Sequence, residues 1–286
     1  MKKRHAILIM AHGQSELLKK NIKLLDSEQI DFYIHIDKKS KEIKVSDLEN
    51  ICEKSNLYAY KKRRVQWGAY SICEVELLLM AEAYKKHYDY YHLISGQDLL
   101  IKPLNEFLSS FEGEKREYVA FGDDLEEKYI ERVKYYYPMT QLLGRIGDLI
   151  DQYLVKIQKK LGVNRIKSIK WQMKKGAQWF SVSENIIKVI LSEKKMIRKL
   201  FHMSSCSDEM FIQTAIFNSR NYDLMEEHND CRRFIDWERG TPYIFKEEDF
   251  EDIVMSDDFF ARKFDYINYP EIVDKICDYV KLSGGV

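Results

Sequence analysis

The sequence predicts an α/β protein with a mostly parallel central sheet flanked by helices. Two apolar runs indicate buried strands, His5 to Ala11 and Phe32 to Ile36, and the residues between them have helical periodicity from Ser15 to Leu25. A strand, a helix and a strand at this spacing are typical of a parallel α/β unit. The 286 residues suffice for a substantial core, and no linker rich in proline, glycine and serine divides them. We therefore expect one domain, residues 1–286.

Short segments further along the chain continue this pattern. Strands are predicted at Leu57 to Tyr60, Tyr90 to Ile94 and Tyr118 to Phe121, and helical periodicity runs from Ser71 to His87. The alternation of strands and helices supports the α/β class.

The segment at about 126–175 predicts a basic helical insertion. Apolar residues recur at helical spacing from Leu142 to Leu161, and lysines and arginines follow up to Lys175 without an intervening acid. A basic amphipathic segment of this kind is able to lie on an anionic membrane surface. The alternative, which the pattern alone favours, is a helical lid with a solvated basic face.

Charge and cysteine usage narrow the classes of partner and compartment. The chain has 46 lysines and arginines and 46 aspartates and glutamates, so its net charge does not attract a polyanion. Nucleic acid is therefore not expected as a partner. Nucleic-acid binding through the Lys156 to Lys175 run is a distant alternative, which steep salt dependence would reveal. The five cysteines lack metal-ligand spacing and indicate a reducing compartment. The apolar run after Arg4 is too short for a signal peptide or a bilayer span.

Two adjacent carboxylates, Asp208 and Glu209, open an apolar segment that ends at Phe217. A carboxylate among apolar residues resists ionisation and becomes a proton acceptor near neutral pH, so Glu209 is the first candidate for a general base. The alternative is an ordinary helix start, with Ser207 or Asp208 as the N-cap.

Polar residues follow the predicted strands at their carboxyl ends. Asp37, Ser95, Gly96 and Asp98 all fall there, where open α/β sheets place their ligands. The alternative is that Asp37 and Asp98 only initiate turns.

Seven segments in a fixed order resemble the Core-2/I-branching glycosyltransferase family, which includes β-1,6-N-acetylglucosaminyltransferases and peptide O-xylosyltransferases. They span residues 6 to 265 and are AILIMAHGQ, YIHIDKKS, RRVQWGAYS, LISGQDLLIKPL, KGAQWFSVS, SDEMFIQT and ARKFD. The resemblance implies a GT-A-like fold and a UDP-sugar as co-substrate. It also implies inverting transfer of a sugar, either N-acetylglucosamine or another hexose or the pentose xylose, to a hydroxyl of a glycan acceptor. If that acceptor were lipid-linked, a membrane surface would present it.

The resemblance also assigns the reacting groups. Glu209 matches the base of the family's Asp-Glu pair, and Lys263 matches its phosphate-binding lysine. Arg239 is the nearest match to a second diphosphate-binding cation, although Arg232 and Arg233 compete for that role.

Residues that match the nucleotide-binding and sugar-binding regions complete the predicted site. The nucleotide-binding set is Ala11, His12, Asp37, Arg63, Trp67 and Gly68, with Arg64 as an alternative to Arg63. The donor and acceptor sugar-binding set is Ser95, Gly96, Asp98, Gln178, Trp179, Asp208 and Trp237. The flat apolar face of a tryptophan suits a pyranose ring, but each of these tryptophans has a packing role as its alternative.

Neither a metal nor another cofactor is expected. The stretch from Ser95 to Asp98 offers one carboxylate where a metal-dependent transferase would need more oxygen ligands, and Asp123-Asp124 and Asp257-Asp258 have solvated surroundings. Cationic side chains should then neutralise the leaving diphosphate. Two rivals stay open: a metal-dependent transferase that uses Asp98, and a non-catalytic carbohydrate-binding protein built on the 19 tyrosines and exposed tryptophans.

The sequence also leads to an expectation about location. Eukaryotic members of the resembled family are usually Golgi type II membrane proteins with lumenal disulfides, and this chain has neither a recognisable anchor nor a disulfide framework. We expect a soluble, cytoplasmic, bacterial member that acts in cell-surface polysaccharide or glycoconjugate synthesis. Peripheral contact with the inner membrane surface is a further hypothesis.

Overall fold

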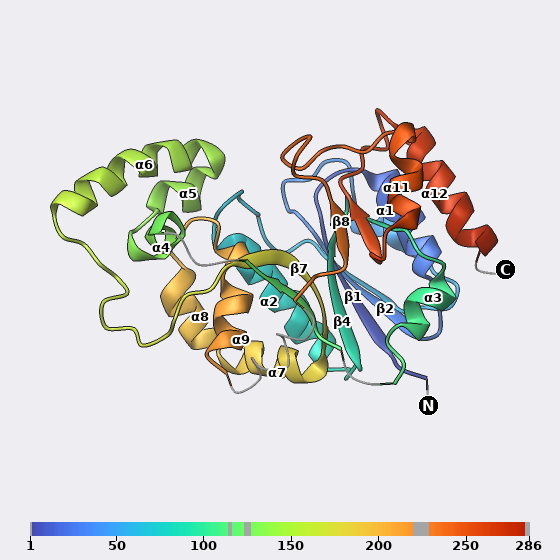
Figure 1. Ribbon diagram of the computed structural model, residues 1–286, viewed down its shortest axis with the longest axis horizontal. Coiled ribbons are helices and arrows are strands. Elements are labelled where there is room, and N and C mark those ends of the chain that lie inside the picture. Colours follow the sequence, from blue (N-terminus) through green and yellow to red (C-terminus); the bar gives the residue numbers. More distant parts are fainter. Residues whose placement is uncertain (1, 114–115, 123–126, 220–228, 284–286) are drawn as a thin grey trace. The chain divides into compact units, whose positions relative to one another are not determined.

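The computed structural model describes residues 2–113, 116–122, 127–219 and 229–283, which form two compact units (Figure 1). The first unit comprises Met1–Lys62, His87–Arg116 and Cys231–Val286, and the second comprises Arg63–Lys86 and Glu117–Asp230. We call them the outer-segment unit and the inner-segment unit. The predicted domain, 1–286, corresponds to both units together and stays a prediction.

Four parallel strands form the main sheet of the outer-segment unit, in the order β3-β2-β1-β4. Their bounds are His5–Ala11 for β1, Ile30–Ile36 for β2, Leu57–Tyr60 for β3 and Tyr90–Ser95 for β4. Strands β1 and β2 are buried almost throughout, which explains why they appear in the sequence as continuous apolar runs. The predicted α/β class with parallel strands is confirmed.

Helices and a smaller sheet surround these strands. The helices are α1 (Ser15–Leu25), α3 (Leu104–Ser109), α11 (Phe250–Met255) and α12 (Pro270–Ser283), with short 3-10 turns η1 (Val45–Leu48) and η3 (Glu247–Asp249). Helix α12 lies against α1 and α11 (Figure 1). The smaller sheet has the order β5-β9-β8, with bounds Leu99–Leu100, Phe260–Arg262 and Arg233–Ile235 respectively.

The inner-segment unit is mainly helical around an antiparallel strand pair, β6 (Tyr118–Phe121) and β7 (Gly176–Ser183). Its helices are α2 (Ser71–Tyr84), α4 (Glu127–Lys134), α5 (Pro138–Leu143), α6 (Arg145–Lys160), α7 (Glu184–Ser192), α8 (Lys194–Phe201) and α9 (Phe211–Phe217), and η2 (Ser207–Glu209) precedes α9. Helix α2 ends earlier than predicted, and His87 adopts a left-handed conformation with φ of 56°.

Helices α5 and α6 form a tight hairpin. A Cβ atom at Gly147 would lie 1.9 Å from the Met139 carbonyl oxygen, so only glycine fits this contact. The buried Asp151 carboxylate accepts hydrogen bonds from the backbone N–H groups of Met139 and Thr140 at 3.2 and 2.6 Å. It also accepts one from the Thr140 hydroxyl at 2.8 Å. Asp151 therefore supplies the acceptor that the first turn of α5 lacks within the helix.

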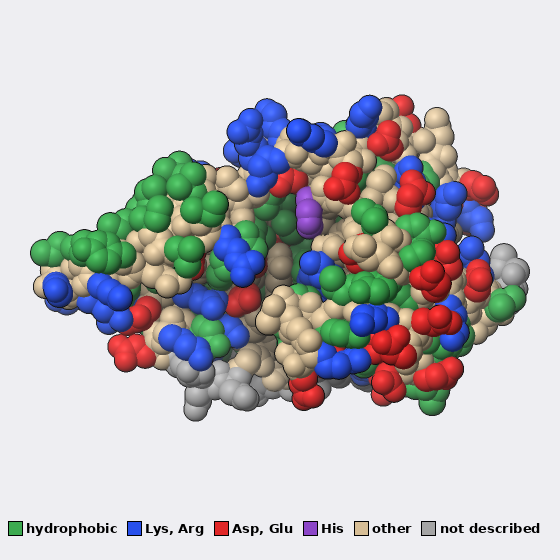
Figure 2. Space-filling model, turned by 90° about the horizontal axis from the view of Figure 1, so that it is seen from above, with side chains coloured by type: hydrophobic (Ala, Val, Ile, Leu, Met, Phe, Trp, Pro, Cys, Tyr) green, Lys and Arg blue, Asp and Glu red, His purple; other side chains and the backbone are tan. Residues whose placement is uncertain are grey.

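The predicted basic helical insertion is helical only in part. Residues 161–175 continue from α6 without a helix, and the large apolar side chains along the hairpin are exposed, as Figure 2 shows. Residue 126 and the Asp123-Asp124 pair lie outside the described residues.

The Asp151 contacts predict a stability effect. The buried Asp151 carboxylate accepts three hydrogen bonds, and Asp151→Asn replaces one of its two acceptor oxygens with an amide group. This change should lower the free energy of unfolding by about 1–3 kcal/mol. Chemical denaturation followed by circular dichroism would measure the change. Asp278→Asn, an exposed carboxylate on α12, is the control and should have little effect. Equal stability of both variants would contradict the role given to Asp151.

Candidate functional site

The carboxyl ends of β1, β2 and β4 bring several predicted residues to one edge of the outer-segment unit. Ala11 ends β1, Asp37 follows β2, and Gly96 follows β4. The backbone N–H of Asp37 donates to the Ala11 carbonyl at 2.8 Å. A Cβ atom at Gly96 would lie 3.1 Å from the Cβ of Ala11, so glycine permits the two strand ends to approach. This edge is the one predicted for a nucleotide.

Both strand-end aspartates form turns. Asp37 accepts a hydrogen bond from the Lys39 backbone N–H at 2.9 Å, and the Lys39 ammonium lies 3.7 Å from its other oxygen. Asp98 accepts hydrogen bonds from the backbone N–H of Ser95 at 2.8 Å and from its hydroxyl at 2.6 Å. The turn-forming alternative is thus realised for both residues, and their ligand-binding roles stay predictions.

Lys263 is half-buried rather than fully exposed and directly follows β9. Burial, and then the charge of Arg262, lower the pKa of Lys263. Lost solvation, and then the charge of Lys263, lower the pKa of His12 although that residue keeps an exposed surface. Nε of Arg262 lies 3.6 Å from Asp98. An anion bound beside Lys263 and Arg262 would stabilise the charged form of Lys263.

The other predicted diphosphate-binding cation, Arg239, is already in ion pairs. Its guanidinium contacts Asp236 at 2.5 Å and Asp249 at 2.6 Å, and it stacks on the Tyr243 ring at 4.1 Å. A diphosphate would have to compete with two carboxylates for this group. The neighbouring Trp237 is 61% exposed, which leaves its ring open to a ligand.

In the inner-segment unit, Glu209 ends η2 and is held by a cation. Its carboxylate accepts a hydrogen bond from the Arg132 guanidinium of α4 at 2.8 Å, and its side chain is 39% exposed. The capping alternative does not account for this pair, because neither η2 nor α9 has a side-chain cap and the Ser207 hydroxyl lies 3.3 Å from the Cys73 sulfur instead. Glu209 is therefore both oriented and accessible.

A second acid, Asp208, lies beside buried groups. Burial, and then the charge of Glu209, raise the pKa of Asp208 to about 7. The wholly buried Glu76 of α2 accepts a hydrogen bond from the Gln178 side chain at 2.7 Å, and burial followed by the charge of Asp208 raises its pKa well above the usual range. Among the described residues, one oxygen each of Asp208 and Glu76 is buried without a hydrogen-bond partner.

The remaining predicted residues of this unit differ in exposure. Gly68 lies next to the Glu209 segment, because its carbonyl accepts a hydrogen bond from the Cys206 backbone at 2.7 Å. Trp67 is 54% exposed and close to Arg145, which argues against a core role, and Arg63 is exposed. Trp179 is only 6% exposed, which fits its packing alternative better than a sugar platform.

Sequence reasoning missed three charged residues. Arg262 adjoins the predicted Lys263 but was not given a role. Glu76 had a usable signal, because it interrupts the apolar face of the helix predicted at Ser71 to His87. Arg132 had none, since only the fold brings α4 to Glu209.

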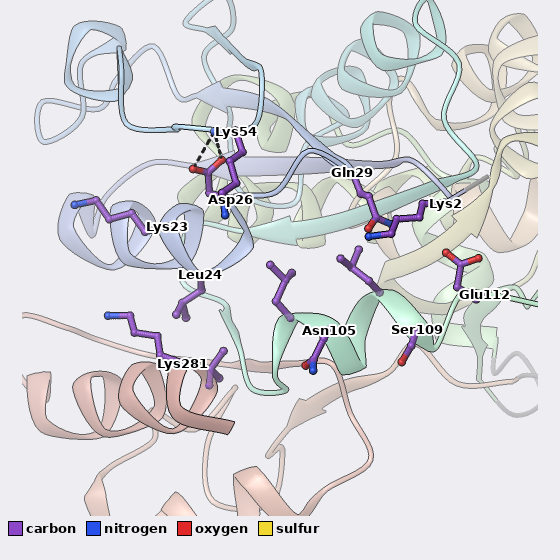
Figure 3. Close-up of a pocket in the computed structure, with 13 residues that line it drawn as sticks. Lys2, Lys23, Leu24, Asp26, Gln29, Lys54, Asn105, Ser109, Glu112 and Lys281 are labelled. Atoms are coloured by element: carbon purple, nitrogen blue, oxygen red, sulfur yellow. Dashed lines mark hydrogen bonds between the residues drawn. The ribbon is translucent and has the colours of Figure 1, made fainter. Parts of the chain in front are cut away.

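A cavity of about 590 Å³ lies elsewhere in the outer-segment unit (Figure 3). Its lining includes Lys2, Gln29 and Lys54, which precede β1, β2 and β3, so it lies at the amino ends of the strands. The predicted site residues are absent from its lining, and the strand-end site is distinct from it.

Among the residues that the structure describes, no group of three or more His, Cys, Asp or Glu side chains is arranged to hold a metal ion. The five cysteines, all within the described ranges, form no disulfide. No helix of the described residues is long and apolar enough to cross a membrane.

These features define an α/β protein with a cationic strand-end site in one unit and an accessible, oriented carboxylate in the other. The chain belongs to the Core-2/I-branching enzyme family, whose model matches residues 6–257, so the predicted family membership is confirmed.

Known proteins similar to this chain are xylosyltransferases. Xylosyltransferase 1 of Rattus norvegicus is 22% identical over 313 residues, which cover 97% of this chain and 35% of that protein. Xylosyltransferase 2 of Canis lupus familiaris is 23% identical over 299 residues, which cover 95% and 33%. This chain therefore spans about a third of the length of these relatives. The apo crystal structure of mouse xyloside xylosyltransferase 1 matches with a TM-score of 0.35 and 9% identity, over 90% of this chain and 96% of that one.

The raised pKa of Asp208 predicts a pH dependence of stability. Because this pKa is about 7 in the folded protein and about 4 in the unfolded chain, the folded state holds an extra proton between these values. Asp208 therefore contributes a fall in the free energy of unfolding as the pH rises from about 4 to about 7, that is, a negative slope against pH. Asp208→Asn should remove this contribution, so the original protein should exceed the variant in free energy of unfolding by more at about pH 5 than at about pH 8, as urea unfolding would measure.

The Asp208 variant should keep part of the slope, because Glu76 contributes with the same sign. Asp278→Asn is again the control, and it should leave the slope as it is in the original protein. An Asp208→Asn slope as steep as that of the original protein would contradict the assignment.

Proposed function

We propose that the protein is an inverting, metal-independent glycosyltransferase of GT-A-like fold that moves a sugar from a UDP-sugar to a hydroxyl of a glycan acceptor. Family membership supports the reaction class. The observation that carries the choice of base is the Arg132–Glu209 ion pair, which orients an accessible carboxylate in the segment that matches the family's Asp-Glu pair.

Glu209 is proposed to take the proton of the acceptor hydroxyl as that oxygen attacks the anomeric carbon. A positioned carboxylate of this kind typically contributes about a hundred- to ten-thousand-fold in rate. One base and a single displacement lead to inversion at the anomeric carbon. Asp208, whose pKa is raised, is proposed to bind the sugar in its protonated form, in which it can donate a hydrogen bond.

Lys263 is proposed to neutralise the leaving diphosphate, and Arg262 supports it. Burial, and then the charge of Arg262, lower the pKa of Lys263, so a bound anion would stabilise its charged form. Asp98 is already engaged by Ser95 and lies 3.6 Å from Arg262, which favours cationic side chains over a metal at this edge. Arg239 stays the second proposed cation, in competition with its own ion pairs.

Ala11, His12 and Asp37 are proposed to bind uridine at the strand ends, with Arg63, Trp67 and Gly68 as further nucleotide contacts. The transferred sugar is proposed to be xylose, as the names of the similar proteins suggest, or N-acetylglucosamine. We expect the acceptor to be a glycan or lipid-linked glycan of a bacterial cell surface and the compartment to be cytoplasmic.

Replacing Glu209 with Gln tests the base. Transfer or slow donor hydrolysis should fall by about a hundredfold or more because the amide does not accept a proton. The affinity for UDP, measured calorimetrically, should change little. Glu127→Gln, an exposed carboxylate at the start of α4, is the control and should keep its activity. An unchanged rate in Glu209→Gln would remove this residue from its role.

Replacing Lys263 with Met tests the metal-free diphosphate site. The affinity for UDP should fall about tenfold or more, because a charge-assisted contact to phosphate is lost. Lys281→Met removes a lysine from the cavity of Figure 3 and should leave the affinity unchanged. The reverse pattern would place UDP in that cavity instead.

A panel of UDP-sugars, with and without EDTA, separates the proposal from its rivals. The proposed enzyme hydrolyses or transfers one donor at the same rate with EDTA present. Loss of activity in EDTA and its recovery with manganese would favour the metal-dependent rival. Binding of glycan with every UDP-sugar left intact would favour a non-catalytic carbohydrate-binding protein.

A further inference from the structure

The α5–α6 hairpin presents an apolar face to solvent. Its large apolar side chains are between 41% and 74% exposed. They are Leu142, Leu143, Ile146, Leu149, Ile150, Tyr153, Ile157 and Leu161. At about 100° per residue, those from Ile146 to Leu161, the residue that caps the end of α6, share an arc of about 120°. We call these eight residues the apolar stripe, and Figure 2 shows hydrophobic side chains gathered over this part of the molecule.

The stripe is exposed because the opposite face of α6 makes the packing contacts. Gly147, Asp151 and Val155 are the buried residues of this helix. Val155 packs in a cluster with Tyr135 and Tyr137, and Asp151 is bound to the start of α5. The hairpin is therefore anchored without the stripe, and burial of the stripe is left to a partner.

The exposed charges of α6 are of one sign. Arg145, Lys156 and Lys160 are exposed; by helical position Arg145 and Lys156 lie along one side of the stripe, and Lys160 lies within its arc. The acids of α6 are held away from it, because Asp151 is buried and Asp148 accepts a hydrogen bond from Ser205 at 3.0 Å. This arrangement complements an apolar surface that carries negative charge.

We propose that the apolar stripe docks on an anionic lipid bilayer. The stripe enters the boundary between headgroups and acyl chains, and Arg145, Lys156 and Lys160 contact lipid phosphates. Tyr153 has the amphipathic character that this boundary favours. A second copy of the chain fits this surface less well, because an antiparallel two-fold contact between identical stripes would bring these like charges together. The inference goes beyond the proposed function and does not require it.

Vesicle flotation with the whole protein tests this docking. Vesicles in which about a third of the lipid is phosphatidylglycerol should bind the protein at least about tenfold more tightly than pure phosphatidylcholine. The triple variant Leu149→Ser, Tyr153→Ser, Ile157→Ser should lose about tenfold or more of this binding. A second variant, Lys156→Gln with Lys160→Gln, should lose roughly fivefold per lysine at low ionic strength and depend less on salt. The second variant keeps the test decisive if the first one does not fold.

Matched controls place equivalent changes elsewhere. Met255→Ser, Ile267→Ser, Leu282→Ser removes three exposed apolar side chains outside the hairpin, and Lys194→Gln with Lys195→Gln removes two exposed lysines of α8. Both should bind vesicles as the original protein does. Absence of binding by the original protein, or equal losses in test and control variants, would overturn the proposal. A dimer in analytical ultracentrifugation that the triple variant dissociates, without vesicle binding, would overturn it in favour of self-association.

Discussion

Parallel strands constrain the outer-segment unit, because all of them end at the same edge of the sheet. The strand order β3-β2-β1-β4 places the turns after β1, β2 and β4 next to one another. Ala11, Asp37 and Gly96 therefore lie close together although they are far apart in the sequence. Hydrogen bonds within these turns orient the carboxylates of Asp37 and Asp98. Lys263, which is half-buried beside Arg262, brings a cation to this edge.

The inner-segment unit places two carboxylates, Asp208 and Glu209, next to each other in the chain. Asp208 and Glu209 are adjacent, yet their surroundings differ: Arg132 forms an ion pair with Glu209, which is 39% exposed, whereas burial, and then the charge of Glu209, raise the pKa of Asp208. A proton on Asp208 or on Glu76 removes a negative charge, and this lowers the electrostatic cost of placing these carboxyl groups close together. Such a division between two neighbouring acids is common where one of them performs acid–base chemistry.

The sequence was most informative where a single physical rule decides the outcome. Nearly continuous apolar runs predicted β1 and β2, because strands buried on both faces have few positions that face solvent. The partners of site residues were harder to predict, since Arg132 reaches Glu209 only through the packing of α4. Periodicity also predicted an apolar face on α6 without revealing that the opposite face, with Gly147 and Asp151, is the one that packs. Gly147 and Asp151 act through close approach and buried hydrogen bonds, which periodicity does not encode.

The central claim is that cationic side chains at the strand-end edge replace a metal at the diphosphate. A crystal structure of the protein with UDP, grown with manganese present, tests it most directly. The account predicts the Lys263 ammonium within hydrogen-bond distance of a phosphate oxygen and no metal between the phosphates and Asp98. A manganese ion bridging the diphosphate to Asp98, or UDP bound away from Lys263, would contradict it.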